Sequence, residues 1–215
     1  MALNKIAVFL RKDWKVNRFR SAIQSAFCSD DITEMILCSG FFQEDTHFKA
    51  SNSFKKTVCT YPPNIKTLKL VGIYSYTWKT KFDDFANNLI LNNCPMCLNV
   101  KKYRVPGMKF HAKMMIGKIK NEPVIATIGS SNITGRAFGI QKNFNYESDV
   151  ILWDESVGSI NTIMNSSIEE FINQSDEVIV SDYSENDWRN GQQTLNDKIK
   201  QLEEDIFDVA VETNE

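Results

Sequence analysis

The 215-residue chain has little of several features that would assign it to a protein class at once. It has no long apolar run, because Arg11-Lys12-Asp13 interrupts the first apolar segment too early for a signal peptide or a membrane span. Its five cysteines are an odd number, which disfavours a disulfide framework. It has no internal repeat. We therefore expect a cytoplasmic protein with reduced thiols and no membrane partner.

The chain also lacks a strong overall charge, since the net charge is −2. The charges are unevenly distributed: seven Lys or Arg and no acid lie between Asn99 and Asn121, and ten acids and three bases lie between Asp182 and Glu215. A near-neutral total can therefore hide a basic patch and an acidic tail. The alternative is that these lysines are only solvated charges on strands.

Apolar periodicity predicts an α/β fold with a mixed β-sheet flanked by helices. Helices are expected at residues 14–28, 83–91 and 156–173. Strands are expected at residues 33–39, 67–73, 98–105, 110–118, 124–128 and 148–153. Residues 42–66 are expected to be a loop with one short helix near 53–57. We expect a catalytic domain over residues 1–180.

Residues 181–215 are expected to form a separate, acidic helical tail. Its apolar side chains have heptad spacing, at Trp188, Leu195, Ile199, Leu202, Ile206 and Val209. Three heptads are short for an independent coiled coil. Two hypotheses stay open, namely packing back onto the domain and docking with another chain.

Histidine is scarce, with two in the chain, and one of them stands in an informative pattern. His111 and Lys113 are two apart in an expected strand, so their side chains should share a face. A second short strand then ends in Gly129-Ser130-Ser131-Asn132. An imidazole, a cation and an amide around one small anion are the groups that phosphodiester chemistry needs.

This pattern resembles the HKD motif of the phospholipase D superfamily, which combines His-x-Lys with a later Gly-Ser/Gly-x-Asn. His111, Lys113, Gly129, Ser130 and Asn132 match. The resemblance implies a phospholipase D-like fold and covers roughly residues 105–153.

The sequence departs from the family pattern at Lys118, where the family has an Asp. That Asp is mostly structural in the family, and nuclease-like members often lack it, so the departure argues more against a lipid enzyme than against catalysis. A downstream acid is also typical of the family, and Glu147 stands at the expected place.

The chemistry suggests a role for each motif residue. His111 would attack phosphorus and form a phosphohistidine, while Lys113 and Asn132 would hold the non-bridging oxygens. Ser130 would add a hydroxyl donor, and Glu147 would orient an imidazole. Gly129 would let the backbone approach the phosphate, and a helix expected to start near Thr134 would point its positive end at it.

The superfamily reaction uses two histidines, whereas this chain has one His-x-Lys. The other histidine, His47, has no lysine two residues later. The resemblance therefore implies a homodimer whose composite active site takes one His111 from each chain.

The function expected from the sequence is a metal-independent nuclease without cofactor, acting on nucleic acid, with DNA favoured over RNA. It could be the nuclease subunit of a restriction or anti-phage defence system that also contains an ATPase. The alternatives are a phospholipid or small phosphodiester hydrolase and an inactive binding module. The expected catalytic residues are His111, Lys113, Asn132 and Glu147, and the expected substrate-binding residues are Gly129, Ser130, Lys109 and Lys118.

Two further patterns have ordinary interpretations. Cys94 and Cys97 resemble half of a zinc site, but no second pair follows, so a structural role is expected. Tyr74, Tyr76 and Trp78 could stack bases or could simply pack at a strand-to-helix junction.

Overall fold

The computed structural model describes residues 4–55, 66–73, 76–107, 111–169 and 177–213. It contains one nine-stranded mixed sheet with the strand order β8-β1-β7-β6-β5-β2-β3-β4-β9. The strands are β1 (Lys5–Arg11), β2 (Glu34–Ser39), β3 (Lys66–Ile73), β4 (Leu98–Val105), β5 (Met114–Ile119), β6 (Glu122–Gly129), β7 (Glu147–Trp153), β8 (Glu177–Asp182) and β9 (Val211–Glu212). Strands β2, β3 and β4 are parallel, and the other neighbours are antiparallel. The predicted α/β fold with a mixed sheet is confirmed.

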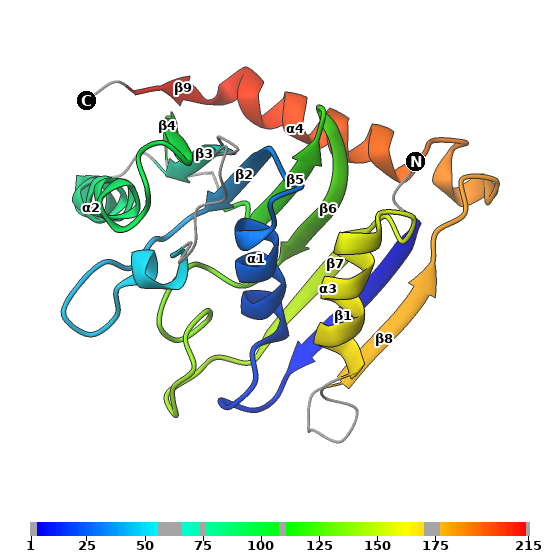
Figure 1. Cartoon of the computed structure of the whole chain (residues 1–215), viewed down its shortest axis with the longest axis horizontal. Coiled ribbons are helices and arrows are strands. Elements are labelled where there is room, and N and C mark those ends of the chain that lie inside the picture. The colour runs from blue at the N-terminus through cyan, green and yellow to red at the C-terminus, as the bar shows by residue number, and fades with distance from the viewer. Residues whose placement is uncertain (1–3, 56–65, 74–75, 108–110, 170–176, 214–215) are drawn as a thin grey trace.

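The helices lie on both faces of this sheet (Figure 1). They are α1 (Arg18–Cys28), α2 (Tyr76–Asn92), α3 (Gly158–Glu169) and α4 (Leu195–Val209), with short 3-10 helices η1 (Ala50–Ser53) and η2 (Trp188–Asn190). Helices α1, α2 and α3 share one apolar core with one face of the sheet, and α4 packs against the other face. None of the helices among the described residues is long and apolar enough to cross a membrane.

Side-chain alternation along the strands explains the two cores. In β5, Met115 faces the α1 side, while Met114 and Ile116 face the α4 side. Strands buried on both faces need apolar residues at every position, which is why β5 is a nearly continuous apolar run. In α1, Phe19 and Ile23 are buried in the first core, as the helical spacing predicts.

The acidic tail packs back onto the domain. Leu195, Ile199 and Ile206 of α4 are buried against the sheet, and β9 pairs with β4. A capping box between Thr194 and Asp197 fixes the start of α4. Strand β8 crosses the boundary expected between residues 180 and 181, so the sheet extends into the tail.

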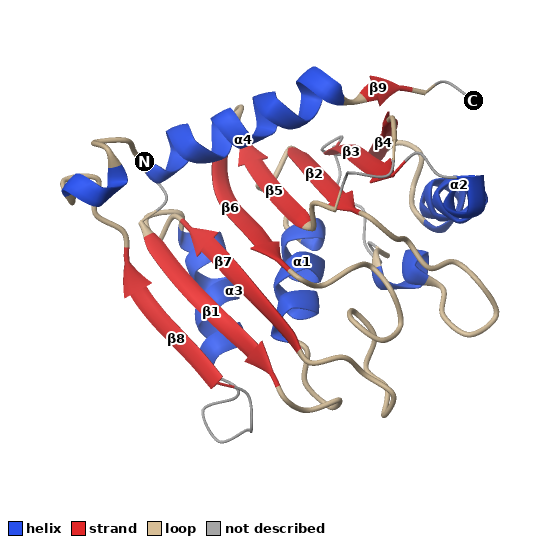
Figure 2. Cartoon of the chain, turned by 180° about the vertical axis from the view of Figure 1, so that it is seen from behind, coloured by secondary structure: helices blue, strands red, loops and turns tan. Residues whose placement is uncertain are grey.

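Among the described residues, α4 covers one end of its face of the sheet and leaves the other end open (Figure 2). One end of the sheet is where β1, β2 and β6 finish and where β5 and β7 begin, and we call it the site end. At the opposite end, α4 crosses the strands (Figure 2). The residues of the His-x-Lys pattern are at the site end, away from α4.

Candidate functional site

His111 and Lys113 lie directly before β5, whereas the sequence predicted a strand from residue 110. His111 is exposed and Lys113 is half-buried. The Lys113 ammonium donates a hydrogen bond to the His111 carbonyl at 2.8 Å. Cys38 pairs with Met114, so this segment enters the sheet beside the end of β2.

The Gly-Ser-Ser-Asn turn contacts the His-x-Lys segment through the backbone. Gly129 N–H donates to the Lys113 carbonyl at 3.1 Å. Gly129 also pairs with Asp149 of β7, and a Cβ at Gly129 would lie 2.8 Å from the Asp149 Cα. Because that Cα belongs to the backbone, only glycine allows β6 and β7 to approach this closely.

Ser130 and Glu147 form the acidic side of the site. The Ser130 hydroxyl donates to the Glu147 carboxylate, and the Asn145 amide donates to the same carboxylate at 3.1 Å. Ser130 Oγ also accepts from Ser148 N–H at 3.1 Å. Glu147 therefore has two donors that fix its orientation at the start of β7. The structure brings Glu147 to Ser130, and the expected role of Glu147 in orienting an imidazole stays a prediction.

Asn132 is held from the end of β2. The Ser39 hydroxyl is 3.3 Å from Asn132 Oδ1 and donates to the Phe41 carbonyl at 2.8 Å. The Phe41 ring lies edge-on to His111, with a centroid distance of 6.3 Å, and packs against Trp78 at 4.6 Å. These contacts bring Asn132 and His111 to the same end of the sheet.

Asp149 is a residue of this site that the sequence analysis missed. It is 3% exposed and accepts hydrogen bonds from Ser131 N–H at 3.2 Å and from Ser131 Oγ at 2.6 Å. Burial is the main cause that raises its pKa from 3.8 to about 6. The hydrogen bonds from Ser131 lower the pKa, whereas the charge of Glu147 raises it. The available signal was its spacing from Glu147, because residues two apart on a strand share a face.

Lys118 does not reach the site. It is 7% exposed at the α4 end of β5, and its ammonium bonds to Glu203 of α4 at 2.9 Å and to Glu34 at 3.1 Å. Burial alone would lower its pKa, but the hydrogen bonds and charges of Glu203 and Glu34 raise it. Lys118 is therefore a structural cation, and we remove it from the expected substrate-binding set.

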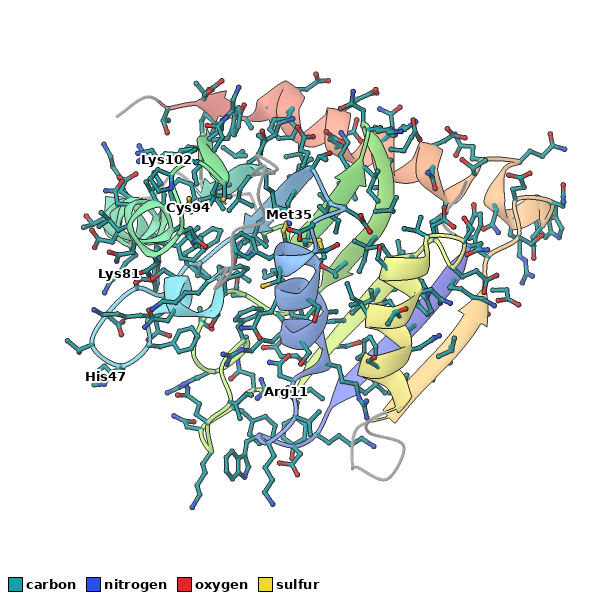
Figure 3. The ribbon with its side chains drawn as sticks, viewed as in Figure 1. Arg11, Met35, His47, Lys81, Cys94 and Lys102 are labelled. Carbon is teal, nitrogen blue, oxygen red and sulfur yellow. The ribbon has the colours of Figure 1, made fainter. Side chains whose placement is uncertain are left out.

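The expected basic patch is only partly assembled. Lys109 lies outside the described residues. Arg104 is buried and bonds to Asp83 at 2.6 Å, and Lys102 pairs with the same carboxylate at 3.3 Å (Figure 3). Strand β4 is also separated from β5 by β3 and β2. Proximity in sequence therefore did not place these cations beside His111.

The helix expected near Thr134 does not form. Residues 134–139 make turns, with Phe138 N–H bonded to the Thr134 carbonyl at 2.7 Å. Gly135 N–H instead donates to the Gln43 side chain at 2.8 Å. Residues 134–139 therefore offer no helix N-terminus to the Gly-Ser-Ser-Asn turn. His47 lies on the exposed loop before η1 (Figure 3).

The remaining candidate groups have ordinary surroundings. Cys97 is buried, and its N–H bonds to the Cys94 carbonyl at 2.9 Å. Within the described ranges, no three His, Cys, Asp or Glu side chains cluster as a metal site would require. Tyr74 lies outside the described residues, as does the side chain of Tyr76.

No protein-family model matches the sequence, and no curated protein sequence matches it. The fold is similar to several solved structures. Phosphatidylserine synthase from Haemophilus influenzae Rd KW20 matches over 95% of this chain and 47% of its own, with 11% identity and a TM-score of 0.46. Polyphosphate kinase from Porphyromonas gingivalis matches over 80% of this chain and 27% of its own, with 10% identity and a TM-score of 0.41. Yeast tyrosyl-DNA phosphodiesterase matches over 76% of this chain and 41% of its own, with 16% identity and a TM-score of 0.37. The chain spans less than half the length of each.

Proposed function

We propose that this chain is a phosphodiesterase that hydrolyses nucleic acid through a phosphohistidine, without a metal ion. The observation that carries the proposal is the gathering of His111, Lys113, Asn132 and Glu147 at one end of the sheet, by the Gly129–Lys113, Asn132–Ser39 and Ser130–Glu147 contacts. No other side chain among these residues is as well suited as His111 to attack phosphorus at neutral pH.

The proposed reaction has two steps. His111 attacks phosphorus, a nitrogen–phosphorus bond forms, and the bond to the leaving oxygen breaks. The leaving oxygen takes a proton from a general acid. Water, activated by the conjugate base of that acid, then displaces the histidine and releases the second product. Lys113 and Asn132 stabilise the equatorial oxygens in both steps.

We assign the general acid to His111 of the partner subunit in a two-fold dimer. The open part of the sheet face supports this, because a row of apolar residues crosses four strands there. Ile179, Val8, Val150 and Ile128 are successive partners in the strand register. Ile179 is 58% exposed and Ile128 is 39% exposed. Since Ile128 directly precedes Gly129, a second copy docked on this row would lie beside the site.

The decisive test is cleavage of single- and double-stranded DNA and RNA in EDTA. His111→Ala should abolish cleavage, whereas His47→Ala, which removes the other histidine, should leave it unchanged. Lys113→Ala should lose about 10²–10³ in rate, the value of one preorganised donor. Activity that vanishes in EDTA and returns with magnesium would show that the mechanism is wrong.

A second experiment tests the dimer. Ile179→Asp should convert the dimer to monomers in light scattering and lower activity with it, while Val211→Asp should not. Val211 is a matched control because it is 55% exposed on β9, at the other edge of the sheet. Fully active monomers would show that one chain suffices.

A further inference from the structure

Two loops flank the site and form one surface, which we call the loop surface and define as residues 12–16 and 136–146. Both loops are at the site end of the sheet (Figure 1). Residues 12–16 follow β1, and residue 146 directly precedes β7. Because Arg11 pairs with Glu147 in the sheet, the two loops leave neighbouring strands at the same level.

Arg11 and Asn17 clamp the second loop to the first. The Arg11 guanidinium donates to the carbonyls of Ala137 at 2.7 Å and of Gly139 at 2.9 Å. The Asn17 amide also donates to Ala137, at 2.9 Å. Arg11 is 6% exposed and points into this loop (Figure 3). The loop surface is thus held by buried polar contacts and is preorganised.

The loop surface carries cations beside one exposed aromatic ring. Tyr146 is 77% exposed, and its ring lies 5.4 Å from Phe144. The Arg11 guanidinium covers Phe144 at 5.1 Å. The exposed cations of the surface are Lys12, Lys15, Arg136 and Lys142. Asp13 is the single acid of these residues, and its carboxylate accepts from Lys15 N–H.

We propose that the loop surface binds the single-stranded nucleic acid that flanks the scissile phosphate, with a base stacked on Tyr146. This inference rests on the proposed function and names its substrate as single-stranded. Aromatic faces are sequence-tolerant platforms for unpaired bases, and cations along the same groove track the phosphates. A duplex keeps its bases stacked inside and cannot offer one to Tyr146.

Tyr146 lies close to the candidate site along the chain. Tyr146 is next in sequence to Glu147, whose carboxylate holds Ser130. A base on Tyr146 would therefore lie close to a phosphate at the site, given ~3.3 Å per residue along β7.

The test is fluorescence anisotropy with labelled 20-nucleotide DNA and RNA strands and their duplexes, using His111→Ala protein so that the probe persists. Single strands should bind at least about tenfold more tightly than duplexes. Tyr146→Ala should weaken this binding about 5- to 100-fold, and Tyr146→Phe should weaken it less than about twofold. Trp188→Ala, which removes an 85% exposed aromatic ring in η2, should change nothing.

The phosphate contacts are tested by salt dependence. Arg136→Gln and Lys142→Gln should each reduce the slope of log K against log salt by about 0.7, as expected for one phosphate on a single strand. Lys120→Gln is the matched control, because Lys120 is exposed in the turn between β5 and β6. Equal affinity for DNA and RNA strands would indicate that the protein contacts only phosphates and bases, as proposed.

The outcomes separate this inference from the proposed function. If single strands bind as expected but the wild-type protein cleaves none of them, the proposed nuclease activity is refuted and the binding role of the loop surface stands. If the wild-type protein cleaves but substitutions at Tyr146, Arg136 and Lys142 leave strand binding unchanged, the binding role of the loop surface is refuted. A Tyr146→Ala protein with a changed mass in light scattering would also refute it, since Tyr146 would then belong to a contact between subunits.

Discussion

Asp149 should make the stability of this protein depend on pH, and Asp149→Asn should remove that dependence. Its pKa in the folded protein is about 6, against an ordinary value of 3.8. The folded protein therefore favours the protonated carboxyl. Protonated Asp149 therefore stabilises the folded state. This stabilisation is fully present below pH 4 and is lost as the pH rises through 6.

The magnitude follows from the difference of about two pK units. At 1.36 kcal/mol per unit, ionising Asp149 costs the folded state up to about 3 kcal/mol. Asparagine can keep both contacts with Ser131, because its oxygen accepts from the Ser131 N–H and its amide donates to Oγ. The stability of Asp149→Asn relative to wild type should thus rise by about 2–3 kcal/mol between pH 4 and pH 7.

The assay is urea unfolding of both proteins at several pH values between 4 and 7.5, with the m-value checked at each. Each protein gives a slope of the free energy of unfolding against pH. Comparing these slopes removes any cost of the substitution that does not depend on pH. Asp208→Asn, at an exposed position on α4, is the matched control and should leave the slope unchanged. Parallel curves for wild type and Asp149→Asn would refute the claim that this carboxyl resists ionisation.

Three further substitutions test the architecture of the two ends of the sheet. Gly129→Ala should destabilise by about 1–3 kcal/mol and impair cleavage, because its Cβ meets the β7 backbone, whereas Gly158→Ala, which meets nothing, should be neutral in thermal melts. Lys118→Met should cost about 3 kcal/mol in urea unfolding, because it removes the buried cation that pairs with the partly buried Glu203, and Lys200→Ala at an exposed pair should cost under about 1 kcal/mol. Arg11→Met should cost at least about 2 kcal/mol and increase proteolysis of the 136–146 loop, because buried carbonyls lose their donor; an unchanged digest would contradict the clamp.

The sequence predicted β3, β4 and β7 closely, because apolar residues recur along each of them. The expected strand at 98–105 matches β4, and those at 67–73 and 148–153 differ from β3 and β7 by one residue. Strands β1, β8 and β9 were not predicted. In β1, Ala7 and Phe9 face the α1 core while Ile6 faces α4, so the strand is a short apolar stretch without strict alternation.

The site was harder to predict wherever it depends on contacts between distant segments. The motif named His111 and Asn132, yet the Ser39 contact that holds Asn132 comes from a strand about ninety residues earlier. Lys118 illustrates the opposite error. Its distance along the chain suggested a cation beside the phosphate, but β5 carries it to the far end of the sheet, under Glu203. Periodicity predicts which face a residue occupies, and it says nothing about a partner from another element.

The two ends of the sheet differ in how their polar groups are bonded. At the α4 end, the buried Lys118 pairs with the partly buried Glu34 and Glu203, and Ile199 and Ile206 cover the apolar face. At the site end, the hydroxyls, amides and carboxylates bond to one another across strand ends, while His111 stays exposed. The acidic tail therefore acts as part of the scaffold through its inner face, and any partner of α4 must use the outer face, where Glu204 and Asp208 are exposed.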